Sequence, residues 1–341
     1  PQVVLAGETL DKPSISFALR GTTLTVNAAS LTWKGGVFSG TGSVGGLGGK
    51  GVTLDLKGKG ESLALEKLAG AFPALKGSGI KGTGTLSWKA SGSPEKLLVE
   101  GALSWKSLRA LDQLGVSDLE IRGSGRVTGG KPALEGPLTL RAARLAWAGA
   151  GVDLPTLALR AEGNRLVVER GEGRVAGGSL AISGTAKLPE RAGEEGTLDF
   201  KGLIRDLGLG ALGKELGLPV ALGGQGTVNF SLGGAPAAPR FALDAAFPTV
   251  TVEGAALADA SVSLEGTPEE IRLTSARGAV EGTPFSLSGT MRPGPQGYAL
   301  DLKGSGEGLD LASLLQRVPA LRDKGVQGKM NLRFSLKGTP G

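Results

Sequence analysis

The residue types that carry most enzymatic chemistry are missing from this sequence. Its 341 residues include no Cys and no His, which excludes thiolate nucleophiles, Ser-His-Asp triads, disulfides and the usual zinc ligands. Acid–base chemistry would have to rest on carboxylate pairs such as Glu194-Glu195 and Glu269-Glu270. Both pairs lie in turn-like stretches, where solvated charge is the better interpretation. We therefore expect no enzyme, no metal site and no cofactor.

Three matches to the dinucleotide-binding pattern Gly-x-Gly-x-x-Gly occur, at residues 40–45, 77–82 and 208–213. The pattern binds phosphate where it opens the helix of a β-α-β unit, and the sequence predicts no such unit around any match. Because 60 of the residues are Gly, matches of this kind arise by chance. They predict no nucleotide site.

The charge pattern also speaks against a nucleic-acid partner. Lys and Arg number 38 against 32 Asp and Glu, for a net charge of +6. The basic residues alternate with acidic ones and form no stripe. The Asn229-Phe230-Ser231 triplet has the form of a glycosylation site, but it lies within a strand-like alternation that favours coincidence.

The elements that must position any site are predicted to be β-strands. Apolar and polar residues alternate with a period of two in residues 86–89, 228–232 and 330–337, which is typical of strands in an antiparallel sheet with one apolar face. About 20 to 24 such segments recur at the spacing of hairpins.

A repeated pentad, Leu-Asp-Leu/Phe-Lys-Gly, occurs at residues 54–58, 198–202 and 300–304. A Pro follows the pentad's Gly after 15, 17 and 15 residues, at Pro73, Pro219 and Pro319. A Gly-x-Pro turn follows the same Gly after 34, 32 and 34 residues, at Gly92, Gly234 and Gly338. Upstream of each pentad lies an x-Ser-Gly-Thr marker, with its Gly at positions 40, 184 and 289. Markers held in one register predict a degenerate repeat.

The spacing of the pentads predicts one continuous array instead of independent domains. We assign residues 1–52 to the end of a preceding repeat unit and residues 53–196 to a unit with extra strands. Residues 197–299 form the next unit, and residues 300–341 start a further one.

One short helix is expected in each unit, between the pentad and its Pro, where apolar residues recur at helical spacing. The three helices are predicted from Leu65, Leu68, Ala69 and Phe72, from the Gly-diluted Leu207, Leu212 and Leu216, and from Leu311, Leu314, Leu315 and Val318. A fourth helix is expected around Leu108, Leu111 and Leu114. We expect these helices to pack on the sheet edge.

A sheet with one apolar face must cover that face. A sandwich or a closed barrel would use aromatic residues freely, yet these make up only 4% of the chain. The alternative is a sheet that Gly-containing turns and bulges curl into a trough, with a non-aqueous ligand over its lining. The predicted fold class is therefore all-β with a few short helices: an elongated, repetitive, strongly curved antiparallel sheet that forms a groove, or β-taco, with an apolar inner face. A sealed core remains the alternative.

The candidates for the groove lining are apolar residues of the most regular strands. They are Leu54, Leu56, Leu86, Trp88, Leu198, Phe200, Val228, Phe230, Leu232, Phe285, Leu287, Leu300, Leu302, Leu332, Phe334 and Leu336.

The chain resembles the periplasmic repeat region of the AsmA-like/TamB superfamily. The resemblance is carried by the Gly-rich β units, by the Leu-x-Leu-x-Gly pentad, and by stretches similar to the family's Gly-x-Leu-x-x-x-Gly-x-x-x-x-Pro phrase at residues 123–138, 224–236 and 328–340. It implies an elongated β-taco in the periplasm, a bridge for phospholipid transport between the inner and outer membranes of diderm bacteria.

The ligand implied by this resemblance is a phospholipid or another acyl lipid. An outer-membrane barrel partner and an inner-membrane anchor are also implied, through parts of the parent protein outside this sequence. Two alternatives remain. One is a scaffold or chaperone that presents its sheet edge to outer-membrane proteins by β-augmentation, and the other is a structural surface β-solenoid with a sealed apolar face.

Overall fold

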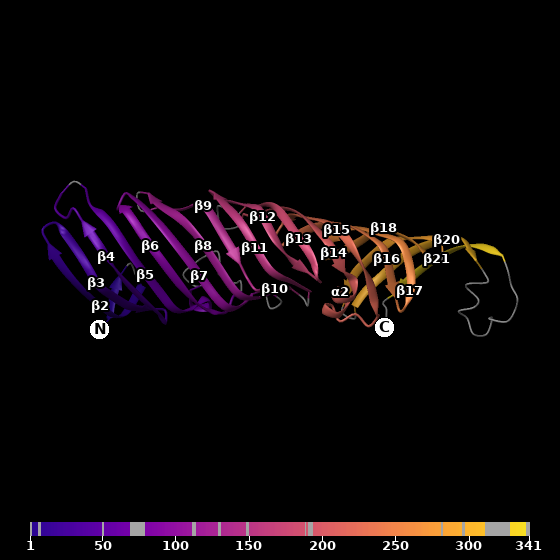
Figure 1. Cartoon of the computed structure of the whole chain (residues 1–341), viewed down its shortest axis with the longest axis horizontal. Coiled ribbons are helices and arrows are strands. Elements are labelled where there is room, and N and C mark those ends of the chain that lie inside the picture. The colour runs from indigo at the N-terminus through magenta and orange to yellow at the C-terminus, as the bar shows by residue number, and fades with distance from the viewer. Residues whose placement is uncertain are drawn as a thin grey trace. The chain divides into compact units, whose positions relative to one another are not determined.

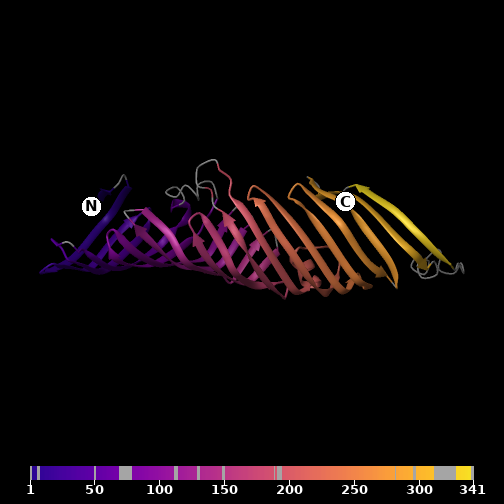
Figure 2. The same cartoon turned by 90° about the horizontal axis from the view of Figure 1, so that it is seen from above.

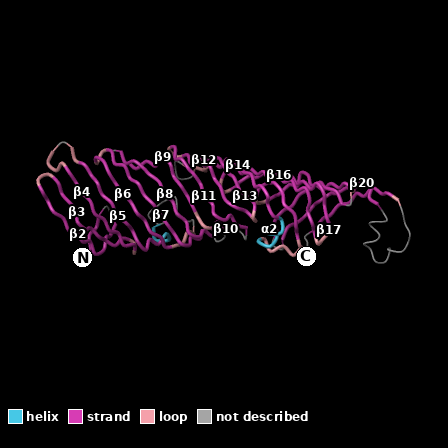
Figure 3. The backbone as a smooth tube through the Cα atoms, viewed as in Figure 1, coloured by secondary structure: helices cyan, strands magenta, loops and turns pink. Residues whose placement is uncertain are grey.

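A computed structural model describes residues 2–5, 8–49, 51–68, 79–110, 114–128, 131–147, 150–187, 189, 194–280, 282–294, 297–310 and 328–338. These residues form 21 strands and two short helices (Figure 1), and strands make up nearly all of the traced backbone (Figure 3). The chain is therefore an all-β protein with an antiparallel sheet, as the sequence predicts. By its contacts it divides into two compact units, residues 1–173 and 174–341.

The first unit holds helix α1 (Leu65–Leu68) and strands β1 to β11. Their bounds are β1 (Gln2–Leu5), β2 (Glu8–Arg20), β3 (Thr23–Trp33), β4 (Gly36–Gly45), β5 (Thr53–Ala64), β6 (Thr83–Ser93), β7 (Lys96–Ala110), β8 (Leu114–Thr128), β9 (Lys131–Arg141), β10 (Arg144–Trp147) and β11 (Ala150–Glu162). Strand β12 (Arg165–Val175) includes the boundary between the units.

The second unit holds helix α2 (Leu209–Glu215) and strands β13 to β21. Their bounds are β13 (Gly178–Lys187), β14 (Thr197–Gly208), β15 (Leu222–Ala235), β16 (Ala238–Val252), β17 (Ala255–Thr267), β18 (Glu270–Val280), β19 (Thr283–Gly294), β20 (Gly297–Asp310) and β21 (Lys329–Gly338).

From β1 to β8, and again from β13 to β21, each strand pairs antiparallel with the next along the chain. The exception lies in the first unit, where β9 and β10 share one position: β8 pairs with β10 through residues 114–117 and with β9 through residues 120–128. In the second unit the run from β13 to β21 is uninterrupted, and its later strands lie side by side in Figure 2. The strands with extensive mutual contact are hydrogen-bonded neighbours.

The pairing register assigns each residue to a face, because directly opposed residues in an antiparallel pair point to the same side. Across β5 and β6, Leu56 opposes Ala90 and Gly58 opposes Trp88, whereas Lys57 opposes Lys89 on the other side. One face is therefore apolar and the other carries the charges, as the period of two predicts.

The repeat recurs in the strand pairing. The first Leu of each pentad opposes the Gly of its Gly-x-Pro turn, in the pairs Leu54–Gly92, Leu198–Gly234 and Leu300–Gly338. These three glycines have φ angles of 123°, 88° and 143°, in the left-handed region that other residues rarely adopt. We call the sheet edge with these turns the turn rim.

A β-bulge recurs near the opposite edge, a few residues after each pentad. The register shifts between Gly60 and Leu63 in β5, between Ile204 and Leu207 in β14, and between Gly306 and Leu309 in β20. Each bulge contains one residue with positive φ, namely Ser62, Asp206 or Gly308. Helices α1 and α2 begin directly after the first two bulges, so we call this edge the helix rim.

The upstream marker needs a correction in its first copy. Gly184 and Gly289 oppose the third residue of their pentads, Phe200 and Leu302, but Gly40 opposes Gly58. The residue equivalent to these two glycines is Gly42, because Gly42, Gly184 and Gly289 share φ angles of 147–149°. Gly42 opposes Leu56, the third residue of the first pentad. The sequence had placed the marker at Gly40, because Phe38-Ser39-Gly40-Thr41 resembles the other two copies.

The helix predictions are confirmed in part. Helix α1 begins at the expected Leu65, and Ala69, Phe72 and Pro73 lie outside the described residues. Helix α2 begins at Leu209, so Leu207 is the end of a strand, and the helix ends before Pro219. The third helix and Pro319 lie outside the described residues.

The fourth helix, around Leu108 and Leu114, is wrong. Leu108 belongs to β7 and opposes Val116 of β8, and Leu114 opens β8, while Leu111 lies outside the described residues. Asp118 has a φ of +48° within β8, which locally breaks the alternation. Val116 and Leu119, three residues apart, consequently join the same apolar cluster. The predicted helix has another origin, because the three-residue spacing from Leu108 to Leu114 runs from the end of β7 to the start of β8.

The predicted boundaries of the repeat units stay a prediction. The division at residues 173 and 174 reflects the density of contacts, whereas the predicted boundaries follow the pentads.

Candidate functional site

The sixteen candidate residues all lie on the apolar face of their unit. In β5 and β6 this follows from the opposed pairs that Leu54, Leu56, Leu86 and Trp88 form with Gly or Ala, and the same reasoning places the others through the registers of β14 to β21. Most of the sixteen are half-buried. Val228 and Leu302 are buried, and Leu332, Phe334 and Leu336 of β21 are exposed.

The opposite face carries ion pairs between residues two apart on one strand. Examples are Lys59 with Glu61 at 2.6 Å and Arg122 with Glu120 at 2.7 Å. The Glu120 carboxylate accepts a hydrogen bond from Arg122 and raises the pKa of its guanidinium. These exposed pairs contribute little to stability, but they keep this face in water and leave the apolar face as the candidate site.

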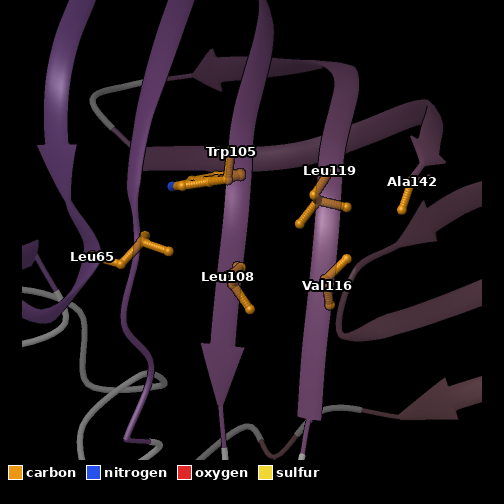
Figure 4. Packing of buried hydrophobic residues seen from close by; sticks show 6 residues of the cluster. All are labelled: Leu65, Trp105, Leu108, Val116, Leu119 and Ala142. Carbon is orange, nitrogen blue, oxygen red and sulfur yellow. The ribbon is translucent and has the colours of Figure 1, made fainter. Parts of the chain in front are cut away.

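A sealed stretch of the apolar face lies in the first unit, beneath the start of α1. Six buried residues form it, which we name cluster 1 (Figure 4): Leu65, Trp105, Leu108, Val116, Leu119 and Ala142. Leu65 comes from the helix rim and the others from β7, β8 and the link after β9, and their side chains project into one space (Figure 4). The apolar face is ordinary core here.

A second sealed stretch lies in the other unit, beneath α2. We name it cluster 2; its buried residues are Ala176, Leu207, Val228, Ala245, Phe247 and Val250. Leu209 and Leu212 of α2 are half-buried against it, and Val228 retains only 3% of its exposure. Helix α2 therefore acts as a cover, so Val228 faces protein and not an open groove.

An open stretch lies in the first unit, over β2 to β6. The face is hollowed there by a cavity of about 620 Å³, within the range of ligand pockets. Its apolar lining includes Val26, Trp33 and Phe38, together with Leu56 and Trp88 from the candidate set. Trp33 and Phe38 are tilted against each other with ring centroids 6.2 Å apart.

The apolar face remains exposed on β2, next to the hollow. Ile15, Phe17 and Leu19 alternate along β2 and oppose Ala29, Val26 and Leu24 of β3, so they continue the apolar face. Their exposed fractions are 60%, 59% and 61%. Three large apolar side chains in a row at such exposure indicate a surface that meets something other than water.

The pentad's Gly has a structural explanation that the sequence did not supply. Gly58, Gly202 and Gly304 each oppose an aromatic residue on the following strand: Trp88, Phe230 and Phe334. A Cβ built on these glycines would lie 2.6, 2.1 and 2.3 Å from the nearest ring atom, which is far inside van der Waals contact. Each ring therefore lies across the glycine, an arrangement that protects glycine positions in sheets.

Sequence reasoning missed the N-terminal part of the open stretch. Trp33, Phe38 and the β2 residues Ile15 and Phe17 lie on the apolar face but were not among the sixteen candidates. Their alternation was present in the sequence, but it was interrupted by bulges in β2 and β3, and the candidates came from the most regular strands.

Two of the three glycine motifs lie wholly within the described residues, and neither opens the helix of a β-α-β unit. Residues 40–45 lie within β4. Residues 208–213 do open α2, but the flanking β14 and β15 are antiparallel, so they form no β-α-β unit. The described residues contain no group of three or more acidic side chains suited to a metal ion. Among them no helix has the length and apolarity needed to cross a membrane.

Comparison of the chain with protein-family models, with curated proteins and with solved structures found no match.

Proposed function

We propose that this chain carries acyl lipids along the apolar face of its sheet, in the periplasm, as part of a bridge between the inner and outer membranes. The observation that carries the proposal is the open stretch of the first unit, where a hollow of about 620 Å³ adjoins the exposed apolar side chains of β2. The AsmA-like/TamB resemblance supplies the location and the phospholipid cargo.

The physical basis is non-directional binding. Each buried methylene of an acyl chain contributes about 0.8 kcal/mol, and this contribution is nearly the same at every position along an apolar surface. An acyl chain can therefore shift along the lining without crossing a large barrier, while its headgroup stays in water. The polar face, with its ion pairs, keeps the outside of the sheet solvated.

A direction of flow requires free energy from elsewhere. The two glycine motifs that the structure describes in full open no β-α-β unit, and the described residues contain no acidic group suited to a metal ion. The chain is therefore proposed as a passive path, with source and sink at the two membranes.

Site-specific photo-crosslinking tests the proposal. A photoreactive phenylalanine analogue in place of Trp88, in the hollow, should yield lipid adducts in cells, as should one in place of the exposed Phe334. The matched control is the analogue in place of Lys89, the next residue on β6, which faces the polar side and should yield none.

Two results would count against the lipid path. Adducts only with outer-membrane proteins would support the β-augmentation scaffold, and an absence of adducts at both apolar positions would support a sealed structural solenoid.

A further inference from the structure

The hollow of the first unit is open on the side of β2. Its lining comes from strands β2 to β6. Ile15 of β2 lines the hollow while 60% of its surface stays exposed. Strand β1 pairs with β2 through residues 8–11, and among the described residues no strand continues the sheet beside Ile15. A ligand can therefore enter the hollow across β2.

The floor of the hollow consists of small residues. Ala29 of β3 and Gly40 of β4 both line it, and they oppose each other in the sheet. The next position across the strands is Gly58 of β5, which opposes Gly40. Neighbouring strands lie about 4.8 Å apart, so this low floor runs across the strands from β2 toward β6.

The indole ring of Trp88 closes the floor at β6. Trp88 lines the hollow and opposes Gly58. Its ring leans over β5, because ring atoms lie 2.6 Å from the point that a Cβ on Gly58 would occupy and 3.7 Å from the same point on Gly40. No ring atom lies within 4 Å of that point on Gly101 of β7, although Gly101 opposes Trp88 directly. The ring is therefore a wall between the hollow and β7.

The two long sides of the hollow are also apolar. Trp33 and Phe38, whose ring centroids are 6.2 Å apart, line the side toward the helix rim. Val26 and Leu56 line the side toward the turn rim, because both oppose Gly42, which lies further along β4 from the helix rim. The exposed lining is almost entirely carbon. A narrow apolar channel with one open and one closed end fits a single acyl chain.

We propose that Trp88 determines the length of acyl chain that the hollow holds. The chain lies across the strands, with its methyl end at the Trp88 ring and its polar end beyond β2. This inference rests on the proposed lipid path and makes the hollow a resting position along it. Methylene groups inside the hollow are covered by floor and sides, whereas those of a longer chain lie over the exposed β2 and are covered on one side.

Affinity should therefore depend on chain length in two phases. Each methylene group that the hollow covers raises the affinity about fourfold. Once the methyl end reaches the Trp88 ring, each further methylene group adds much less. The break between the phases reports the length of the hollow, which spans four strand spacings, or about 19 Å.

The test uses the purified chain and lysophosphatidylcholines with one saturated chain of 8 to 16 carbons. Each lipid is used below its critical micelle concentration, so that single molecules bind, and its Kd is measured by displacement of a fluorescent fatty acid. We expect the Kd to fall about fourfold per methylene group up to the break and then to level off.

Variants of the wall locate the break. Trp88→Ala opens the hollow toward Gly101 and should move the break to longer chains. The matched control, Val26→Ala, removes lining from one long side; it should weaken binding of the longer and shorter chains alike and leave the break in place. If Trp88→Ala does not fold, as judged by circular dichroism, Trp88→Leu gives the same comparison, because it shortens the wall and still covers Gly58.

The outcomes separate the two proposals. An affinity that rises evenly through the whole series, or a break that the Trp88 variants leave in place, overturns the role of Trp88 and leaves the lipid path intact. If none of the lipids binds, the lipid path is overturned, and the role of Trp88 with it.

Discussion

Leu86 and Val228 occupy the same position in two copies of the repeat, yet their surroundings differ. Each opposes the residue two positions after the pentad's Gly: Leu86 faces Gly60, and Val228 faces Ile204. Val228 is almost fully buried beneath α2 as part of cluster 2, whereas Leu86 is half-buried and belongs to neither sealed cluster. The same alternating pattern thus yields packed core in one copy and a half-buried position outside both sealed clusters in the other.

The difference shows that the assignment of a side chain to the apolar face and its burial on that face have separate causes. The period of two assigns a side chain to the apolar face, and pairing across the sheet maintains that assignment. In clusters 1 and 2 the cover includes residues of the helix that follows the bulge at the helix rim, Leu65 in cluster 1 and Leu209 and Leu212 in cluster 2. The covered stretches of a sheet can therefore stabilise the fold, while its open stretches remain available for binding.

The largest effect is expected from a charge placed at these two positions. Val228→Asp buries a carboxylate without a partner, which costs about 3–5 kcal/mol and should unfold much of the second unit. Leu86→Asp should stay folded, because its carboxylate can reach water, but should weaken lipid binding.

Two probes separate these outcomes. Circular dichroism reports both units, whereas all four Trp residues, Trp33, Trp88, Trp105 and Trp147, precede residue 174 and report only the first unit by fluorescence. Equal unfolding in the two variants would mean that Leu86 is also sealed.

A smaller effect is expected from removing the cover. Leu209→Ser/Leu212→Ser takes two half-buried side chains off cluster 2, at a cost of about 2–4 kcal/mol by analogy with Leu truncations in cores. The variant should also bind an apolar dye or an acyl lipid at the newly exposed cluster. The control, Leu216→Ser/Leu218→Ser, alters two exposed residues of the same loop and should do neither.

If Leu209→Ser/Leu212→Ser binds no dye or lipid, exposed apolar side chains alone do not create a binding surface, and the shape of the hollow is also needed. Dye fluorescence measures the binding, and urea titration of the same samples measures the free energy of unfolding.

The smallest of the three effects is expected at the pentad's glycine. Gly202→Ala places a methyl group 2.1 Å from the Phe230 ring, and overpacking of this kind costs about 1–3 kcal/mol. Phe230→Ala removes packing of its own, but it should cost less in the Gly202→Ala background than in the natural chain, because the added methyl group then has room. Gly101→Ala, on the same kind of face but with its nearest neighbour at 3.5 Å, should change the unfolding midpoint little. An equal cost of Phe230→Ala in the two backgrounds would show that the ring is not the obstacle.

Local pattern sufficed to predict the strands, their antiparallel pairing and the face of all sixteen candidates, because alternation and turn glycines are properties of neighbouring residues. It did not suffice at irregular points. The leucines spaced by three residues from the end of β7 to the start of β8 resembled a helix. In the upstream marker, Gly40 matched the other two copies by sequence, although the structurally equivalent glycine is Gly42.

The cover over each candidate could not be predicted at all. Val228 and Leu86 have equivalent letters around them, and only the three-dimensional position of Leu209 and Leu212 distinguishes the two.

The rings that lie across the pentad's glycines have a consequence for how such a chain can change over time. Gly202 and Phe230 occupy one shared volume, so neither position is free to vary alone: a larger residue at the first requires a smaller one at the second. Of the twenty-seven positions between them, Gly226 shares its volume with the Phe247 ring in the same way, whereas an exposed position such as Leu218 carries no such condition. The glycine and the aromatic residue opposite it should therefore change together or not at all in every repeat, while the loops between them vary in length and composition.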